Sequence, residues 1–247
     1  MRLKCIACEV LARPLYFSAA TSPHIIDIQL IEKGLHEHPQ KLRDHLQDQI
    51  DATRSDTYEA ILLAYGLCGQ ATSGLTARDV PMVIPRAHDC ITLFLGSRTR
   101  YQDQFSQYPG TYWYVQDYIE REKEPGSSLS LGAAYTDDIK SVYNDYVAKF
   151  GQENADYLME VMGAWHSHYQ RAAYIDMGIG NGDGVQAKAE AEAQRRGWTF
   201  ERMVGDMVLI RRLLVGPWED DFLTVQPGQQ IHMSYDENIL CANQIPT

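Results

Sequence analysis

The sequence predicts an α/β fold, with a mostly parallel sheet, flanking helices and a Rossmann-like arrangement. Short, strongly apolar runs alternate along the chain with segments whose apolar residues recur at helical spacing. Residues with chemical function follow directly after several of the apolar runs, which is typical of loops at the active edge of a parallel sheet. Both halves of the chain show this pattern, so we expect two half-sheets with a helical insert between them.

The predicted elements follow from these runs. The predicted strands are residues 3–7, 25–31, 60–65, 81–85, 110–118, 172–177, 200–204 and 222–226. The predicted helices are residues 10–20, 41–52, 185–196 and 207–215, with one more beginning within 90–95. Residues 137–168 are also predicted to be helical, as two helices divided at Gly151. The chain then divides into an N-terminal α/β half (1–119), a linker with a helical segment (120–170) and a C-terminal α/β half (171–247).

The composition excludes several classes of partner. A net charge of -11 argues against nucleic acid and against an anionic membrane, because both require a basic surface. No stretch is apolar over the ~20 residues that a membrane span needs. The 5 cysteines are an odd, widely spread set and do not suggest a disulfide framework. We therefore expect a cytoplasmic protein that binds a small-molecule substrate or ligand.

Three cysteines lie just past the carboxyl ends of predicted strands. Cys8 follows the first apolar run, Cys68 follows the run 60–65, and Cys90 follows the run 80–85 together with His88. Because the carboxyl ends of parallel strands share one edge, these side chains can meet there. Three thiolates and an imidazole form a tetrahedral zinc set, and three cysteines can also anchor an iron–sulfur cluster. The alternatives are a reactive thiol and buried strands that carry cysteines as core residues.

Neighbouring charged residues are candidates for catalysis or substrate positioning. Glu9 follows Cys8, while Arg86 and Asp89 flank His88. A carboxylate can orient a ligating imidazole, and an arginine can position an anionic substrate. We expect Glu9, Arg86 and Asp89 to act around the metal.

We expect Cys5 and four histidines of the N-terminal half to lie outside the site. Cys5 and Cys8 form a CxxC string, but strand alternation sends residues 5 and 8 to opposite faces, so Cys5 is expected in the core. Four histidines in a polar stretch are expected to be solvated: His24, His36, His38 and His45.

A glycine-rich loop follows the predicted strand 172–177. Its sequence fits the DxGxGxG pattern of S-adenosylmethionine methyltransferases, through Asp176, Gly178, Gly180 and Gly182. In that interpretation these residues face the amino-acid part of the cofactor, and Glu201 bonds the ribose. The alternative is a βα loop whose Asn-Gly and Asp-Gly turns serve only the fold.

Five strings resemble domain-of-unknown-function family 1638. They are residues 6–9, 61–69, 83–97, 109–112 and 172–178, and the resemblance extends over roughly residues 3–235. Members of that family are often encoded beside corrinoid-dependent methyltransferases for methylated amines. The resemblance therefore implies a role in one-carbon metabolism with a corrinoid protein or methyltransferase as partner, and it supplies no catalytic residues.

Together these patterns predict a metal-binding protein, with zinc or an iron–sulfur cluster, in corrinoid-linked methyl-group metabolism. One alternative is a non-catalytic accessory protein that binds a corrinoid, a metal or a methylated amine, which 15 tyrosines and an acidic surface would suit. Another is an S-adenosylmethionine-dependent enzyme. The sequence leaves the oligomeric state open, a homo-oligomer included.

Overall fold

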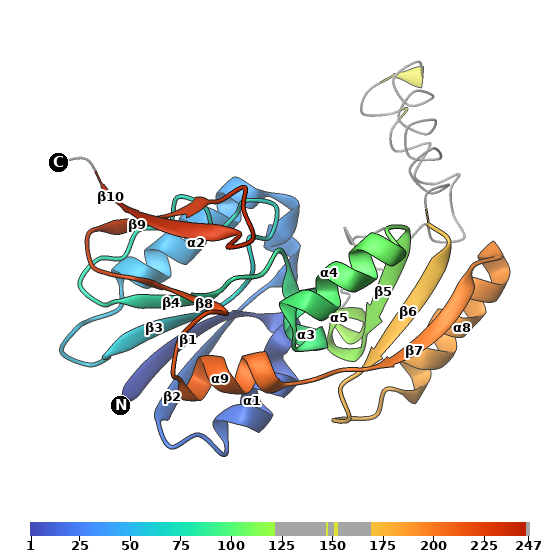
Figure 1. Cartoon of the computed structure of the whole chain (residues 1–247), viewed down its shortest axis with the longest axis horizontal. Helices are drawn as coiled ribbons and strands as arrows, with labels where there is room; N and C mark the ends of the chain where they lie inside the picture. The colour runs from blue at the N-terminus through green and yellow to red at the C-terminus, as the bar shows by residue number, and fades with distance from the viewer. Residues whose placement is uncertain (122–146, 148–150, 153–168, 246–247) are drawn as a thin grey trace.

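A computed structural model describes residues 1–121, 147, 151–152 and 169–245 of the chain. Two open sheets lie side by side, with helices between and around them (Figure 1). A two-stranded hairpin lies against the first sheet near the C-terminal end (Figure 1). The predicted α/β class, with a mostly parallel central sheet and flanking helices, is confirmed.

The first sheet has the strand order β2-β1-β3-β4-β8. Its strands are β1 (Arg2–Cys8), β2 (Ile25–Ile31), β3 (Ala60–Ala64), β4 (Met82–Pro85) and β8 (Phe222–Val225). The first four strands are parallel, and β8 runs antiparallel to β4. All residues of β3 and β4 are buried, which explains why these runs are continuously apolar and do not alternate.

Helices cover both faces of the first sheet. The segments around it are η1 (Glu9–Leu11), α1 (Ala12–Ala19), η2 (Lys33–Glu37), α2 (Pro39–Asp51), α3 (Cys90–Leu95) and α9 (Val208–Val215). Helices α1 and α9 pack together on one face, and α2 lies on the other (Figure 1). Helix α2 buries Leu42, Leu46 and Ile50, as their spacing of four predicts.

The second sheet is parallel and has the order β5-β6-β7. Its elements are α4 (Arg98–Gln107), β5 (Thr111–Val115), α5 (Gln116–Glu120), β6 (Arg171–Asp176), α8 (Asp183–Arg196) and β7 (Thr199–Val204). Helix α8 covers one face. The other face contributes Val115, Ile175 and Met203 to the same apolar core as the first sheet, so the two sheets share one packed interior.

The chain after β7 returns to the first sheet. Helix α9 and strand β8 both join it, and the hairpin of β9 (Gln229–Met233) and β10 (Leu240–Gln244) follows. The first sheet is therefore built from both ends of the chain. None of the described helices is long and apolar enough to cross a membrane.

Three local features differ from the sequence-based expectations. The aromatic strand predicted over 110–118 ends at Val115 and continues as α5. Helix α4, which the sequence did not predict, buries none of its residues and so lacks an apolar stripe. The terminal hairpin was also not predicted. Most of the helical segment predicted over 137–168 and most of the predicted linker lie outside the described residues.

Candidate functional site

The carboxyl edge of the first sheet collects most of the chemically active side chains. Strand β1 ends at Cys8, which lies beside Ile31 at the end of β2. The loops after β3 and β4 then run together, because Leu67 N–H donates to the Ala87 carbonyl (2.8 Å) and Cys68 N–H donates to the His88 carbonyl (2.9 Å). The loop that carries Cys68 is thereby fixed against the loop that carries Cys90.

Gly66 makes this close approach possible. A Cβ atom at Gly66 would lie 2.8 Å from both the Ala87 carbonyl oxygen and the Asp89 backbone nitrogen. Both contacts are with backbone atoms, which cannot rotate away. Only glycine therefore lets the two loops meet at this distance.

Cys68 has an unusual backbone conformation. Its φ is +47°, and the next two residues, Gly69 and Gln70, also have positive φ values of +62° and +72°. A left-handed non-glycine residue costs on the order of 1–3 kcal/mol and persists only where its surroundings hold it. Here the Thr72 hydroxyl, which donates to the Gly66 carbonyl (3.1 Å), helps to hold the loop. Such strain is concentrated at functional sites in proteins.

The thiols of Cys8, Cys68 and Cys90 lie within electrostatic reach of one another. Burial raises the pKa of all three, that of Cys8 to about 12. Burial is the largest cause of these shifts. The next largest cause is Cys8 for the pKa of Cys68, and Asp89, Cys68 and Cys8 for the pKa of Cys90. The structure therefore places the three cysteines that the sequence singled out at one edge of the sheet, where burial favours the neutral form of each thiol.

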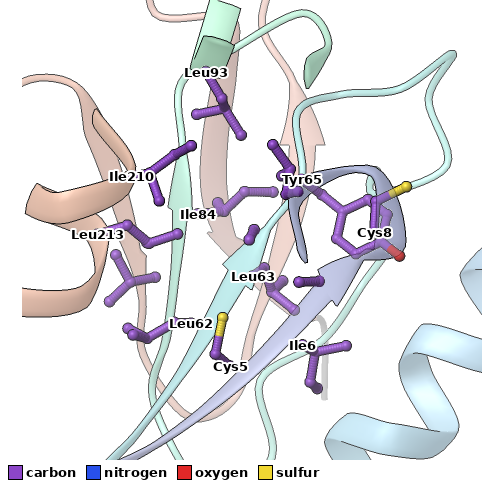
Figure 2. Packing of buried hydrophobic residues seen from close by; sticks show 14 of the residues in the cluster. Cys5, Ile6, Cys8, Leu62, Leu63, Tyr65, Ile84, Leu93, Ile210 and Leu213 are labelled. Carbon is purple, nitrogen blue, oxygen red and sulfur yellow. The ribbon is translucent and has the colours of Figure 1, made fainter. Parts of the chain in front are cut away.

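Cys5 lies apart from this group. It pairs in register with Leu62 in the middle of the sheet, and Figure 2 shows it among the apolar side chains, away from Cys8 at the strand end. Burial alone raises the pKa of Cys5 to about 12, and no other thiol contributes. Cys5 is a core residue, as the strand alternation predicts.

His88 and Asp89 occupy different environments. His88 is exposed, and its ring stacks on that of Tyr101 with centroids 6.1 Å apart. Asp89 caps helix α3 by accepting a hydrogen bond from Ile91 N–H (2.9 Å), and it also accepts one from the Tyr101 hydroxyl (3.0 Å). Burial raises the pKa of the Asp89 carboxyl. Asp89 thus orders the Cys90 loop, whereas His88 lies on its solvent side.

Glu9 belongs to a polar network that leads toward the second sheet. Its carboxylate accepts from Lys33 N–H (2.9 Å) and pairs with Arg121 (3.4 Å). Arg121 also pairs with Asp117 in α5 (3.4 Å), and Asp117 pairs with Arg13 (2.9 Å). The network fixes the start of η2 and the end of α5 beside Cys8.

Arg86 has a different set of partners from the other site candidates. Its guanidinium donates to the backbone carbonyls of Phe222 (3.3 Å), Asn238 (3.1 Å) and Leu240. These bonds attach the terminal segment to the end of β4. Burial lowers the pKa of this guanidinium.

Two residues of the site were not recognised from the sequence. His36 was expected to be solvated, but its Nε2 atom is buried, and its ring stacks on Tyr65 with centroids 5.9 Å apart. Tyr65 is 1% exposed, and its hydroxyl is also buried. Neither polar atom has a hydrogen-bond partner within the described part of the chain. Their positions in the sequence could have identified them, because His36 follows β2 and Tyr65 follows β3, at the same edge as the cysteines.

The gathered side chains do not form a finished ligand cage. Within residues 1–121 and 169–245, no group of three or more His, Cys, Asp or Glu side chains is placed to hold a metal ion. The fit to a metal therefore rests on the chemistry of the donor set, which is three thiols at one edge of the sheet. At the same edge, the buried His36 Nε2 and Tyr65 Oη atoms have no partner among the described residues. Closing such a cage would require side-chain rotation, which a cysteine can make about its single χ1 bond.

The glycine-rich loop is filled by the protein itself. A Cβ atom at Gly182 would lie 1.8 Å from the Tyr174 hydroxyl, and one at Gly180 would lie 2.7 Å from Gln116 Oε1. The Gln116 amide also donates to the Asn181 carbonyl (2.9 Å). Two of the loop glycines therefore make room for side chains of this chain.

The acidic residues expected to bind a cofactor at this loop have internal partners. Asp176 accepts from Gly178 N–H (2.9 Å) and pairs with Arg202. Glu201 pairs with the buried Arg171 (2.8 Å). The loop has the connectivity of a nucleotide-binding turn, while its polar side chains are already engaged.

A family model described as protein of unknown function (DUF1638) matches residues 30–214. The match includes the Cys68 and Cys90 loops, His36 and the glycine-rich loop, and it begins after Cys8. No curated protein and no solved structure shows significant similarity to the chain.

Proposed function

Because the chain belongs to the DUF1638 family, whose function is unknown, its activity has to be argued from the site, and we propose that it is a thiolate metal-binding protein. Cys8, Cys68 and Cys90 hold zinc or an iron–sulfur cluster at the carboxyl edge of the first sheet. The observation that supports this most is the placement of the three cysteines at one edge, after the parallel strands β1, β3 and β4, where the Cys68 backbone N–H donates to the His88 carbonyl.

The chemistry of the donor set supports a cation. Cys8 raises the pKa of Cys68, and both raise the pKa of Cys90, while no positive charge compensates at Cys68 or Cys90. A bound divalent cation supplies that charge and keeps coordinating thiols deprotonated. The cost of ionising the group is then offset by coordination.

The topology of the first sheet supports a ligand at the same place. The order β2-β1-β3-β4 reverses direction between β1 and β3, and α1 and α2 lie on opposite faces (Figure 1). In doubly wound, Rossmann-like sheets, ligands bind at this switch point, outside the carboxyl ends of the strands. Cys8 and Cys68 follow the two strands that flank it.

Corrinoid-linked methyl-group metabolism is the proposed setting, in accordance with the family resemblance. A zinc ion in such a site supplies Lewis acidity and can hold a thiol acceptor as its thiolate. Glu9, tied to η2 and α5, and Asp89, tied to Tyr101, then order the two loops around the metal.

Elemental analysis with an absorption spectrum tests the proposal, on protein purified without oxygen or chelator. We expect near-stoichiometric zinc, or iron with a broad visible absorption. Cys68→Ser and Cys90→Ser are expected to lose the metal while keeping the fold. Cys5→Ser is the control, since Cys5 is a buried cysteine of the same sheet that is not coupled to the other thiols, and it should keep the metal. Full metal content in both test variants would contradict the proposal.

An S-adenosylmethionine-dependent activity is the second candidate, and the position of the glycine-rich loop between β6 and α8 favours it. Isothermal titration with S-adenosylhomocysteine tests it on the parent and on Gly180→Ala. Binding by the parent that Gly180→Ala abolishes would support it. Equal binding by both proteins, or no binding by either, would exclude it.

A non-catalytic accessory role is the third candidate, suggested by the acidic surface. Titration with quaternary ammonium compounds and with cobalamins distinguishes it from the first. Tight binding of either ligand by a metal-free protein would favour this role.

A further inference from the structure

We propose that the chain forms a symmetric dimer through the outer edge of strand β2, so that two copies of the first sheet join into one continuous sheet. The partner is a second copy of the same chain, paired antiparallel to the first across a two-fold axis. The interface lies along the side of the sheet, not at the carboxyl ends of the strands where the cysteines gather. Dimerisation therefore does not require a bound metal.

Strand β2 is the outermost strand of the first sheet. It pairs with β1 on one side, and no other described strand pairs with its outer side. Figure 1 shows the terminal hairpin at the opposite side of the sheet, where β10 lies against β8. The β8 side is thus covered, whereas the β2 side is open among the described residues. An open strand edge offers a row of unpaired N–H and C=O groups to another strand.

The hydrogen bonds to β1 identify which backbone groups of β2 face outward. The Ile25 N–H donates to the Met1 carbonyl (3.0 Å), so Ile25 directs its backbone groups toward β1. Since these groups alternate in direction along a strand, those of Ile26, Ile28 and Leu30 point away from β1. Their backbone groups make no hydrogen bond to any other described residue. Three residues therefore offer both a donor and an acceptor on the outer side of β2.

The spacing of these three residues allows β2 to pair with itself. In an antiparallel pair with Ile28 on the two-fold axis, Ile28 lies opposite Ile28 of the second copy, and Ile26 lies opposite Leu30. These are the hydrogen-bonded positions of an antiparallel ladder, where two opposite residues exchange both N–H···O bonds. Every outward N–H and C=O group of the three residues then has a partner.

The side chains favour this register over its two neighbours. With the axis at Ile28, Asp27 lies opposite Gln29, and no like charges face each other. With the axis at Asp27, two carboxylates would lie directly opposite each other, which is unfavourable. With the axis at Gln29, Ile26 would have no partner within the strand. Charge and hydrogen bonding therefore select the same register.

The edge also has apolar surface to bury. Asp27 is the only ionisable residue of β2, and it already pairs with Arg2 of the same chain (2.9 Å). Ile25 is 61% exposed, and α1, which contacts β2, leaves Tyr16 and Phe17 54% and 52% exposed. Strand pairing between proteins combines backbone hydrogen bonds with side-chain contacts of this kind. The edge thus lacks the charges that keep many edge strands apart.

Strand β7, at an edge of the second sheet, provides a contrast. The Thr199 N–H donates to the Gln170 carbonyl (2.9 Å), so alternate residues, Arg202 and Val204 among them, direct their backbone groups outward. This strand carries the exposed charged side chains of Glu201 and Arg202. Charged side chains are a common protection of strand edges. We therefore expect no self-pairing at β7, which makes it an internal control.

Sedimentation velocity and light scattering over a range of protein concentrations test the inference on the full chain. Ile28→Pro removes an outward N–H and places a ring at the two-fold axis, while the bonds to β1 remain. Val204→Pro makes the same change at an outward position of β7 and is the matched control. Gln29→Asp places a carboxylate opposite Asp27 of the second copy, and Gln29→Lys places an ammonium there. Both lose the Gln29 bond to Gln49 in α2, so the comparison between them reports the charge.

We expect the parent to be a dimer. Ile28→Pro should raise its dissociation constant by about 100-fold or more, and Gln29→Asp by about tenfold. Gln29→Lys should lower the dissociation constant, and Val204→Pro should match the parent. The backbone amides of Ile26, Ile28 and Leu30 should exchange slowly with deuterium in the parent dimer and rapidly in Gln29→Asp at concentrations where that variant is monomeric.

A parent that stays monomeric at every concentration would overturn the inference. So would a dimer that Gln29→Asp and Gln29→Lys leave equally stable, or one in which the Ile28 amide exchanges as fast as in a monomer, because its interface would lie elsewhere. If circular dichroism showed that Ile28→Pro does not fold, the two Gln29 variants and the exchange rates would still decide the question.

Discussion

The glycine-rich loop and the carboxyl edge of the first sheet differ in how completely their polar groups find partners within the protein. At the glycine-rich loop after β6, Tyr174 and Gln116 fill the space beside the glycines, and Arg202 pairs with Asp176. At the carboxyl edge of the first sheet, Cys8 raises the pKa of Cys68 and both raise that of Cys90, and two buried polar atoms have no partner among the described residues. A loop whose polar groups are paired within the protein needs no ligand, whereas a sheet edge with unpaired buried polar atoms is suited to bind one.

The largest expected effect on stability and on metal binding is that of Gly66→Ala, at the carboxyl edge of the first sheet. The new methyl group would meet three backbone atoms of the 86–90 loop at 2.8–2.9 Å, so the two cysteine loops would have to separate. We expect a loss of about 3 kcal/mol or more in the free energy of unfolding, together with loss of metal binding. Urea unfolding and metal titration measure the two effects.

Gly34→Ala is the control for this substitution. Gly34 lies in η2, has no atom within 4 Å of its added Cβ and does not have a positive φ. It should change stability little. If Gly66→Ala behaved like Gly34→Ala, the close approach of the two loops would not be needed for the site.

The pH dependence of the metal-free protein gives the next largest effect. Unfolded histidine takes up a proton near pH ~6.5, whereas folded His36 stays neutral down to a pKa of about 4. Between these values the unfolded state binds more protons, so stability falls as the pH is lowered through this window. We expect His36 to account for a loss of about 2–3 kcal/mol at the acid end.

Urea unfolding of the chelator-treated parent and of His36→Phe across this pH range measures the contribution. The difference between the two curves isolates His36 from the carboxylates, because the carboxylates titrate alike in both proteins. His45→Gln, at an exposed position, should follow the parent. Parallel curves for the parent and His36→Phe would show that His36 is not buried as described.

A double-mutant cycle tests whether Gly182 makes room for Tyr174 in the glycine-rich loop. Gly182→Ala places a methyl group against the Tyr174 hydroxyl, and we expect it to cost about 1–2 kcal/mol. Tyr174→Phe removes the oxygen that clashes, leaving the ring carbon at 3.0 Å, so the double variant should recover part of that loss. Thermal or urea unfolding of the four proteins gives the coupling energy. Additive losses would mean that Gly182 is not there to accommodate Tyr174.

The smallest expected effect concerns the ion pair between Arg202 and Asp176. The Arg202 side chain is 53% exposed, so water and salt screen the pair. We expect Arg202→Gln to lower the free energy of unfolding by less than ~1 kcal/mol, with a smaller difference at high salt. A larger loss in urea unfolding would show that the loop depends on this pair for its shape.

Much of the fold was predictable because its signals are local. Strands β3 and β4 are continuous apolar runs, since both of their faces are covered, and α2 has its buried residues at a spacing of four. Helix α4 and the terminal hairpin were missed, because α4 buries no residue and the hairpin depends on partners far away in the chain.

The sequence by itself determined which residues end the strands, and hence that Cys8, Cys68 and Cys90 would meet at one edge while Cys5 would not. Strand direction and alternation are enough for that, because they follow from backbone geometry. Only the tertiary structure decided that His36 lies buried against Tyr65, and that Arg86 holds the terminal segment. It also decided that Tyr174 fills the glycine-rich loop. These outcomes depend on which distant side chain occupies a given space, and local sequence patterns do not record that.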